Sequence, residues 1–207
     1  MTPPKNIINI PDGSNVYFTS DTHFNHSNII KFCDRPFKDI EDMNNSIICN
    51  WNSKVPIDGL IFILGDFAWG GFPVWEKLVS QLNGRKILIK GNHDVRQNLQ
   101  NDERLNRMFE YVCNQLLINI EGRNIYLNHY PFLCYSGTYS QEPTYQLFGH
   151  VHSNPRSEEG LDHKRLVNCF PTQYDVGVDN NNFTPISFDE LHSYINNRQM
   201  SLGMAAK

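Results

Sequence analysis

Carboxylate, amide and imidazole side chains recur directly after short apolar runs in this sequence. Seven of them stand out by type and position: Asp21, His23, Asp66, Asn92, His129, His150 and His152. Oxygen and nitrogen donors of this kind suit Mn, Fe, Zn, Co or Ni better than metals that prefer thiolates. Because seven ligands exceed the needs of one ion, we expect two divalent or trivalent ions about 3.5–4 Å apart. Asp66 is the expected bridge, since a carboxylate on a central strand has two oxygens to share.

The apolar runs that precede these side chains are expected to be strands. The run 60–64 is five residues long, indicates a fully buried strand, and ends in Gly65-Asp66. Pro73 and Gly84 then bracket an expected helix that leads into another strand at Ile87. This βαβ order makes the two strands parallel and places Asp66 and Asn92 at neighbouring carboxyl ends, where open α/β sheets carry their sites.

Other segments complete a mixed α/β pattern. Ser27 is a plausible N-cap for a short helix through Phe32, and apolar residues at helical spacing predict a helix from Asp39 to about Lys54. The runs 116–120 and 125–128 flank a turn at 121–124, which indicates a hairpin and hence antiparallel pairing. Residues 187–190 have the spacing of a capping box that begins a final helix.

Composition narrows the class of protein. The chain has 207 residues, which fit one domain covering 1–207, and its net charge of -4 offers no evident surface for a nucleic-acid polymer or an anionic membrane. Its apolar runs are too short to span a membrane, and its first residues do not resemble a signal peptide, so we expect a cytoplasmic protein. Five widely spaced cysteines without a Cys-x-x-Cys pair predict reduced, mostly buried thiols.

The ordered motifs carry a family resemblance. The series Asp21-x-His23, Gly65-Asp66, 91–94 (Gly-Asn-His-Asp), His129 and Gly149-His150-x-His152 resembles the calcineurin-like metallophosphoesterase superfamily. The resemblance implies an α/β fold of two packed mixed β-sheets flanked by helices, a four-layer α/β/β/α sandwich. It assigns one metal to Asp21, His23 and His152, the other to Asn92, His129 and His150, and both to Asp66.

The resemblance also implies an activity. A metal-bridging hydroxide would attack phosphorus, and His93, which binds no metal, would give a proton to the leaving oxygen. Asp94 would either orient His93 or cap the following helix. The second motif continues as Phe67-Ala68-Trp69-Gly70 without the arginine that clamps phosphomonoesters in protein phosphatases, so a phosphodiesterase is favoured over a phosphomonoesterase.

The substrate stays open at this stage. The short chain and its opening motif resemble compact bacterial or phage phosphoesterases of unassigned substrate. The acidic balance and the single compact domain offer no evident track for a polymer, which favours a small phosphodiester or nucleotide. The nearest candidates to hold phosphate oxygens are Asn25, His26, Arg35 and Arg96. The aromatic segment 130–139 would either stack a nucleobase or pack a loop onto the sheet edge. A metal-dependent nuclease and a non-catalytic metal-binding scaffold are the alternatives, and the sequence gives no oligomeric state.

Overall fold

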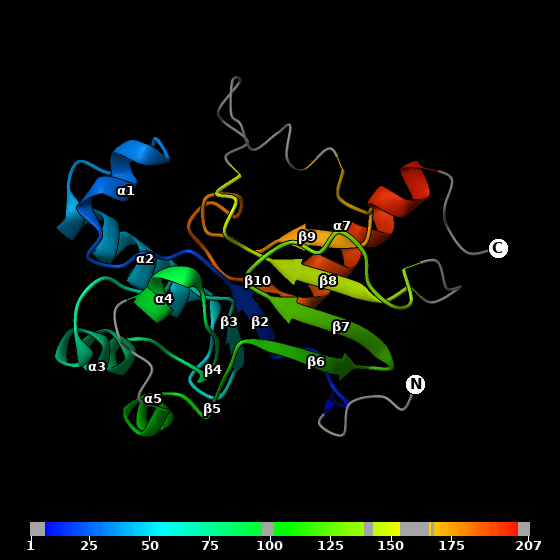
Figure 1. Ribbon diagram of the computed structural model, residues 1–207, viewed down its shortest axis with the longest axis horizontal. Coiled ribbons are helices and arrows are strands. Elements are labelled where there is room, and N and C mark those ends of the chain that lie inside the picture. The colour runs from blue at the N-terminus through cyan, green and yellow to red at the C-terminus, as the bar shows by residue number, and fades with distance from the viewer. Residues whose placement is uncertain (1–6, 97–101, 139–142, 154–165, 167, 203–207) are drawn as a thin grey trace.

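Two five-stranded mixed sheets form the centre of the molecule, and helices flank them, as the sequence predicts (Figure 1). The computed structural model describes residues 7–96, 102–138, 143–153, 166 and 168–202. One sheet has the order β10 (Ile186–Ser187), β2 (Val16–Thr19), β3 (Leu60–Ile63), β4 (Arg85–Ile89) and β5 (Tyr111–Cys113). The other has the order β1 (Ile8–Ile10), β6 (Gln115–Ile120), β7 (Arg123–Asn128), β8 (Tyr145–Phe148) and β9 (Gln173–Asp175).

The first sheet contains the βαβ unit that the sequence predicts. Strands β2, β3 and β4 are parallel and in register, with Phe18, Phe62 and Ile87 side by side. Helix α2 (Ile40–Lys54) lies between β2 and β3 in the chain, and α3 (Phe72–Gln81) lies between β3 and β4. All three strands therefore end at the same edge of the sheet, and their following loops meet there.

Strand β3 is buried on both faces, which explains its unbroken apolar run. Ile61 and Ile63 pack with Trp51 of α2 and Trp75 of α3 in an outer core. Phe62 faces the opposite way and joins an inner core between the two sheets. Successive side chains of a strand point to opposite faces, so one strand serves both cores.

The remaining helices complete the two sides of the molecule. They are α1 (Ser27–Phe32), α4 (Asn92–Arg96), α5 (Asp102–Met108) and α7 (Phe188–Ser201). Helix α7 begins with the predicted capping box, in which Ser187 accepts from Glu190 N and the Glu190 carboxylate accepts from Ser187 N. It lies on the other side of the sheets from α1, α2 and α3 in Figure 1.

Two predicted helix ends are wrong. Ser27 is the first helical residue of α1 rather than its N-cap, and His26 occupies the cap position without a side-chain hydrogen bond. Helix α3 ends at Gln81 rather than at Gly84. Gly84 instead turns the chain into β4 at φ +89°, a conformation in which glycine avoids the steric cost of a side chain.

The hairpin between β6 and β7 is tighter than predicted. Its turn contains only Glu121 and Gly122, with φ of +50° and +84°, and Arg123 already belongs to β7. Two consecutive residues of positive φ match the right-handed twist of the flanking strands, so a two-residue turn suffices.

The aromatic segment packs against the second sheet, which supports the packing alternative for most of its described part. Phe132 and Tyr135 both make edge contacts with Tyr126 of β7, and Phe132 N donates to Gln146 of β8. Tyr130 differs, because its ring lies against His129 and His150. Residue 139 of the predicted segment lies outside the described residues.

None of the five cysteines, all of which lie within the described residues, takes part in a disulfide, but the prediction that most are buried is wrong. Cys49 and Cys134 are exposed and the other three are partly buried, because they lie on a helix surface, in a loop or at element ends. Within the part of the chain that the structure describes, no helix has the length and apolar character needed to cross a membrane.

Candidate metal centre

The loops that follow the strands bring all seven predicted ligands to one edge of the sandwich. Among the described residues, two of the three groups whose ligand atoms lie within 4.8 Å of one another consist of predicted ligands: Asp21, His23 and His152, and Asp66, His129 and His150. Asn92 joins the second group, because its Oδ1 lies 3.1 Å from His129 Nε2. These are the two ligand sets that the resemblance implies.

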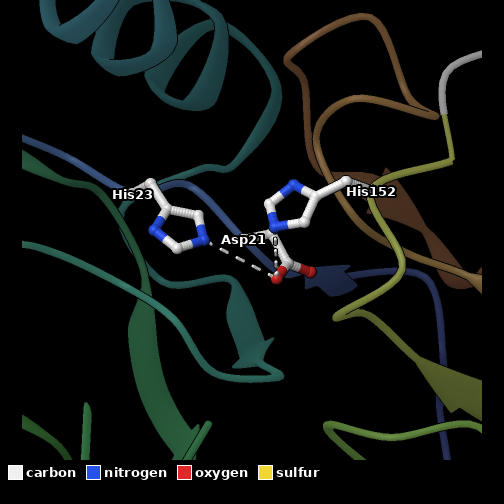
Figure 2. Close-up of side chains that lie close together, drawn as sticks. All are labelled: Asp21, His23 and His152. Carbon is white, nitrogen blue, oxygen red and sulfur yellow. Dashed lines mark ion pairs between the residues drawn. The ribbon is translucent and has the colours of Figure 1, made fainter. Parts of the chain in front are cut away.

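The first group surrounds the carboxylate of Asp21. Figure 2 shows His23 and His152 approaching it from two sides, with Nε2 to Oδ1 distances of 4.0 and 3.7 Å. The other oxygen of Asp21 accepts from His150 N at 2.8 Å. Asp21 Oδ1 and His23 Nε2 are buried and have no hydrogen-bond partner among the described residues. Buried polar atoms are nearly always paired, so these two fit a site for a cation.

Asp66 lies between the two groups. Its Oδ2 is 3.7 Å from His23 Nε2 in the first group and 3.4 Å from His129 Nε2 in the second. Burial alone would raise the pKa of Asp66, but the hydrogen bond and charge of His129, together with His23, hold it below its usual value. A carboxylate in this position fits the predicted bridge.

The proton on His129 can be assigned from its neighbours. Its Nδ1 lies 2.7 Å from the carbonyl oxygen of Leu64, which only accepts, so Nδ1 donates. Nε2 then faces the oxygens of Asp66 and Asn92, and a second proton or a cation must lie between them. Burial lowers the pKa of His129, but Asp66 and Asp21 outweigh it and raise the pKa to about 9 in the metal-free protein. A cation would replace that proton.

The ligand backbones adopt an unusual conformation. Five predicted ligands have positive φ: Asp21 (+56°), His23 (+48°), Asp66 (+53°), His150 (+70°) and His152 (+48°). Each such residue costs about 1–3 kcal/mol and persists only where the surroundings impose it, most often at functional sites. The first and third residues of both Asp-x-His and His-x-His share this conformation, so the two motifs bend in the same way.

Two motif glycines allow the loops to approach. A Cβ at Gly91 would lie 2.3 Å from Asp66 Oδ1, and a Cβ at Gly149 would lie 2.2 Å from Asp21 Oδ2. Neither distance is sterically possible. The glycines are therefore needed because a ligand carboxylate packs directly against their backbone.

His93 lies beside the ligands, as the resemblance implies. Its backbone N donates to Asp66 Oδ1 at 2.8 Å, and its Nε2 is 4.0 Å from Asp66 Oδ2. The ring makes an edge contact with His23 at 5.2 Å, and the side chain is 28% exposed. The His93 ring can therefore contact a molecule that enters from solvent while it stays beside the ligands.

Asp94 does not orient His93. It is buried and accepts hydrogen bonds from the backbone N of Asp66 (2.8 Å), Phe67 (3.0 Å) and Gly91 (2.8 Å). No hydrogen bond joins it to the His93 ring in the described structure, so the predicted catalytic role is corrected. Burial and the charge of Asp66 raise the pKa of Asp94 to about 6. The hydrogen bond from Gly91 N, the residue before α4, agrees with the alternative that Asp94 caps a helix. The bonds from Asp66 N and Phe67 N connect the loop after β3 to α4.

Arg35 also needs correction as a substrate-binding residue. Its guanidinium pairs with Asp179 through two bonds and donates to the carbonyl oxygens of Asp21 and Thr22 and to Met43 Sδ. Both side chains of the ion pair are fully buried. Every guanidinium N–H has an acceptor inside the protein, so none is left for a phosphate.

The other three substrate-binding candidates have different surroundings. Asn25 is exposed, and its side-chain oxygen accepts from Asn44. His26 stacks on Trp69 with ring centroids 4.7 Å apart and lies 5.3 Å from the His23 ring. Burial lowers the pKa of His26. Arg96 ends α4, and its side chain lies outside the described residues.

Sequence reasoning missed Asp179, whose Oδ2 lies 2.9 Å from His152 Nδ1. The signal was present, because Asp179 follows the apolar residues Val176 and Val178 soon after β9. It also missed Trp69, an exposed ring beside His93. Tyr130, the exposed ring beside His150, belongs to the aromatic segment for which the sequence left stacking or packing open.

Comparisons with known proteins find relatives that cover most of the chain. An uncharacterised protein of Methanocaldococcus jannaschii is 33% identical over 176 residues, covering 84% of this chain and 87% of that protein. The gene 66 protein of Mycobacterium phage D29 is 29% identical over 91% of this chain and all of its own length. A crystal structure of an Aquifex aeolicus protein of unknown function is 28% identical, covers 86% of this chain and 97% of its own, and has a TM-score of 0.64.

A family model covers most of the chain. The model described as calcineurin-like phosphoesterase matches residues 14–197 and so includes both ligand groups, Asp66 and His93. This family implies metal-dependent hydrolysis of phosphoesters. With the predicted motifs gathered at one edge of the predicted fold, the chain belongs to the calcineurin-like phosphoesterase family.

Proposed function

We propose that this protein hydrolyses a small phosphodiester, with a nucleotide ester as the favoured substrate, at a dinuclear metal centre. The observation that carries the proposal is the place of Asp66, whose Oδ2 faces His23 of one ligand group and His129 of the other. One ion would use Asp21, His23 and His152, the other Asn92, His129 and His150, and both would share Asp66. Mn, Fe, Zn, Co and Ni all suit these donors.

The ions supply what the protein side chains lack. When bound, two cations lower the pKa of water enough to make a nucleophile at neutral pH and neutralise charge on the phosphoryl oxygens. The chain holds the ligands by fixed hydrogen bonds, such as those from His150 N to Asp21 and from His93 N to Asp66. These bonds leave one oxygen of each carboxylate directed at the imidazoles.

His93 is proposed as the general acid. Its partly exposed ring lies next to Asp66 and His23 but belongs to neither ligand group. As an imidazolium it would give its proton to the departing oxygen, a contribution of about 10²–10⁴-fold for poor leaving groups.

The proposal favours a diester over a monoester. A monoester carries one more negative charge and usually needs an arginine clamp, and the one described arginine predicted for that role, Arg35, is buried against Asp179. The exposed rings support an aromatic group in the substrate. Trp69 lies 5.8 Å from His93 and Tyr130 lies 4.7 Å from His150 between ring centroids, and each is 44% exposed.

The proposal is tested by comparing two esters. Metal-free protein is reconstituted with Mn²⁺ and assayed on bis(4-nitrophenyl) phosphate and on 4-nitrophenyl phosphate, with Asp66→Asn as the control for contaminating activity. We expect a higher kcat/KM on the diester. A strong preference for the monoester would contradict the substrate proposal, and no activity on either ester with two ions bound would contradict hydrolysis of these esters.

The nucleotide preference has a direct optical test. Trp69 is exposed, whereas Trp51 and Trp75 are fully buried, so a nucleotide in the site should quench mainly Trp69. We expect saturable quenching in the metal-loaded wild type and its loss in Trp69→Phe. Equal quenching in both proteins would place the nucleotide elsewhere.

A further inference from the structure

A buried carboxylate holds the outer side of one ligand histidine. His152 Nε2 faces Asp21, and its other ring nitrogen, Nδ1, lies 2.9 Å from Asp179 Oδ2. Figure 2 shows these two nitrogens on opposite sides of the ring, one directed at Asp21 and one away from it. The side chain of Asp179 is fully buried. Because a carboxylate accepts and does not donate, this contact keeps a proton on Nδ1 and leaves the Nε2 lone pair free for a cation.

Asp179 is itself held in a fixed orientation. Arg35 Nε donates to Oδ1 at 2.8 Å and Arg35 Nη2 donates to Oδ2 at 2.9 Å. The same guanidinium donates to the carbonyl oxygens of Asp21 at 2.7 Å and of Thr22 at 3.0 Å. Arg35 therefore joins the backbone of one ligand, Asp21, to the carboxylate that orients another, His152.

A gain in stability is a weak explanation for this buried ion pair. Burying two charges costs desolvation free energy, and apolar residues of similar volume often stabilise a core as well or better. The pair has a use at the site, because an ionised partner at Nδ1 makes an imidazole a stronger ligand through Nε2.

We propose that Asp179, held by Arg35, is a positioning residue that fixes the ring and the proton of His152 and thereby sets the affinity of the Asp21–His23–His152 group for its cation. This inference rests on the proposed metal centre. It concerns one ion of the two, since neither Asp179 nor Arg35 contacts Asp66, His129 or His150 through any described hydrogen bond or ion pair.

Cys33 is the alternative to Asp179 as the group that sets the behaviour of His152. Its sulfur, a nitrogen of His152 and an oxygen of Asp179 lie within 4.8 Å of one another. If the thiol rather than the carboxylate sets the behaviour of His152, Cys33→Ser will reproduce the effect of Asp179→Asn. Cys33→Ser is therefore the matched variant.

The test measures metal binding rather than catalysis. Metal-free wild type, Asp179→Asn and Cys33→Ser are titrated with Mn²⁺ by equilibrium dialysis, and the two dissociation constants are fitted. For Asp179→Asn we expect one constant to rise by about 10–100-fold and the other to stay within about twofold, the range known for groups behind a ligand histidine. We expect Cys33→Ser to change neither. Unchanged constants in Asp179→Asn, or an equal change in Cys33→Ser, would overturn the inference.

A purely structural role of Asp179 would give a different combination of Tm and metal dissociation constants. Ile47→Val serves as a destabilised control, because Ile47 is buried in the outer core, a cluster that contains none of the seven predicted ligands. If Asp179 only supports folding, Asp179→Asn will lower Tm, as this control does, with both metal constants unchanged. That result would also overturn the inference.

A measurement on wild type covers the case in which Asp179→Asn does not fold. In ¹⁵N-histidine-labelled protein loaded with Zn²⁺, we expect His152 to carry its proton on Nδ1, with slow exchange, and to bind through Nε2. Coordination through Nδ1 would overturn the inference. Wild type that binds fewer than two ions would instead contradict the proposed dinuclear centre, so the two failures are distinguishable.

Discussion

Replacing Asp94 by alanine should destabilise the metal-free protein by about 3–5 kcal/mol. Its carboxylate accepts three hydrogen bonds from the buried backbone N–H groups of Asp66, Phe67 and Gly91. Each buried donor left without an acceptor costs about 1–3 kcal/mol. We expect the lower part of the summed range, because relaxation of the loops recovers some of these bonds and the substitution removes repulsion from Asp66.

Asp94→Asn separates the hydrogen bonds from the charge. Asp94 Oδ2 accepts two of the three bonds and Oδ1 accepts the one from Phe67 N. The amide oxygen should therefore take the Oδ2 position and the amide nitrogen should face Phe67 N. One bond is then lost, and the expected cost is about 1–3 kcal/mol.

Urea unfolding of the metal-free proteins measures both values by linear extrapolation. Asp39→Ala is a matched control, because Asp39 accepts one exposed bond, from Asp42 N at the start of α2, and its loss should cost about 1 kcal/mol. An Asp94→Ala variant that loses no more stability than Asp39→Ala would show that the three bonds contribute little. An Asp94→Asn variant as unstable as Asp94→Ala would contradict the separation of hydrogen bonds from charge.

Two further substitutions test the geometry of the site. Gly149→Ala should lower the affinity for the ion held by Asp21, because its Cβ would lie 2.2 Å from Asp21 Oδ2, and metal titration should show no such loss for the surface change Gly122→Ala in the open turn. His93→Asn should slow the hydrolysis of alkyl or nucleoside esters by about 10²–10⁴-fold and of nitrophenyl esters much less, because only poor leaving groups need a proton. The variant should keep both ions, because His93 is not a predicted ligand. Rates measured over a series of leaving-group pKa values test this difference between esters, and parallel plots for wild type and variant would contradict a general acid.

Much of the site could be predicted from the sequence because the ligands follow strands. An apolar run that ends in Gly-Asp or Gly-His gives both the element and its exit, and parallel pairing of β2, β3 and β4 then brings Asp21 and Asp66 together. This logic is local and needs no knowledge of side-chain contacts. It succeeds for the two mixed sheets, and the structure brings the predicted ligands close together, while their role as ligands stays a prediction.

The supporting contacts could not be predicted in the same way. Arg35 is a charged loop residue in the sequence, and its burial depends on Asp179, which lies 144 residues further along the chain. Asp94 accepts bonds from a loop 27 and 28 positions earlier, which no spacing rule indicates. The positive φ of Asp21 and His152 is imposed by packing, since neither residue favours it strongly by itself.

A dinuclear centre bridged by Asp66 would bind two metal ions per chain, and the metal content of the reconstituted protein measures this number. Wild type and Asp66→Asn are reconstituted with Mn²⁺, freed of excess metal by gel filtration and analysed by inductively coupled plasma mass spectrometry against protein concentration. We expect close to two ions per wild-type chain and a fall in the occupancy of both sites in Asp66→Asn, because Asp66 faces both ligand groups. One ion per wild-type chain, or a variant that loses one ion and retains the other in full, would contradict the bridged dinuclear centre.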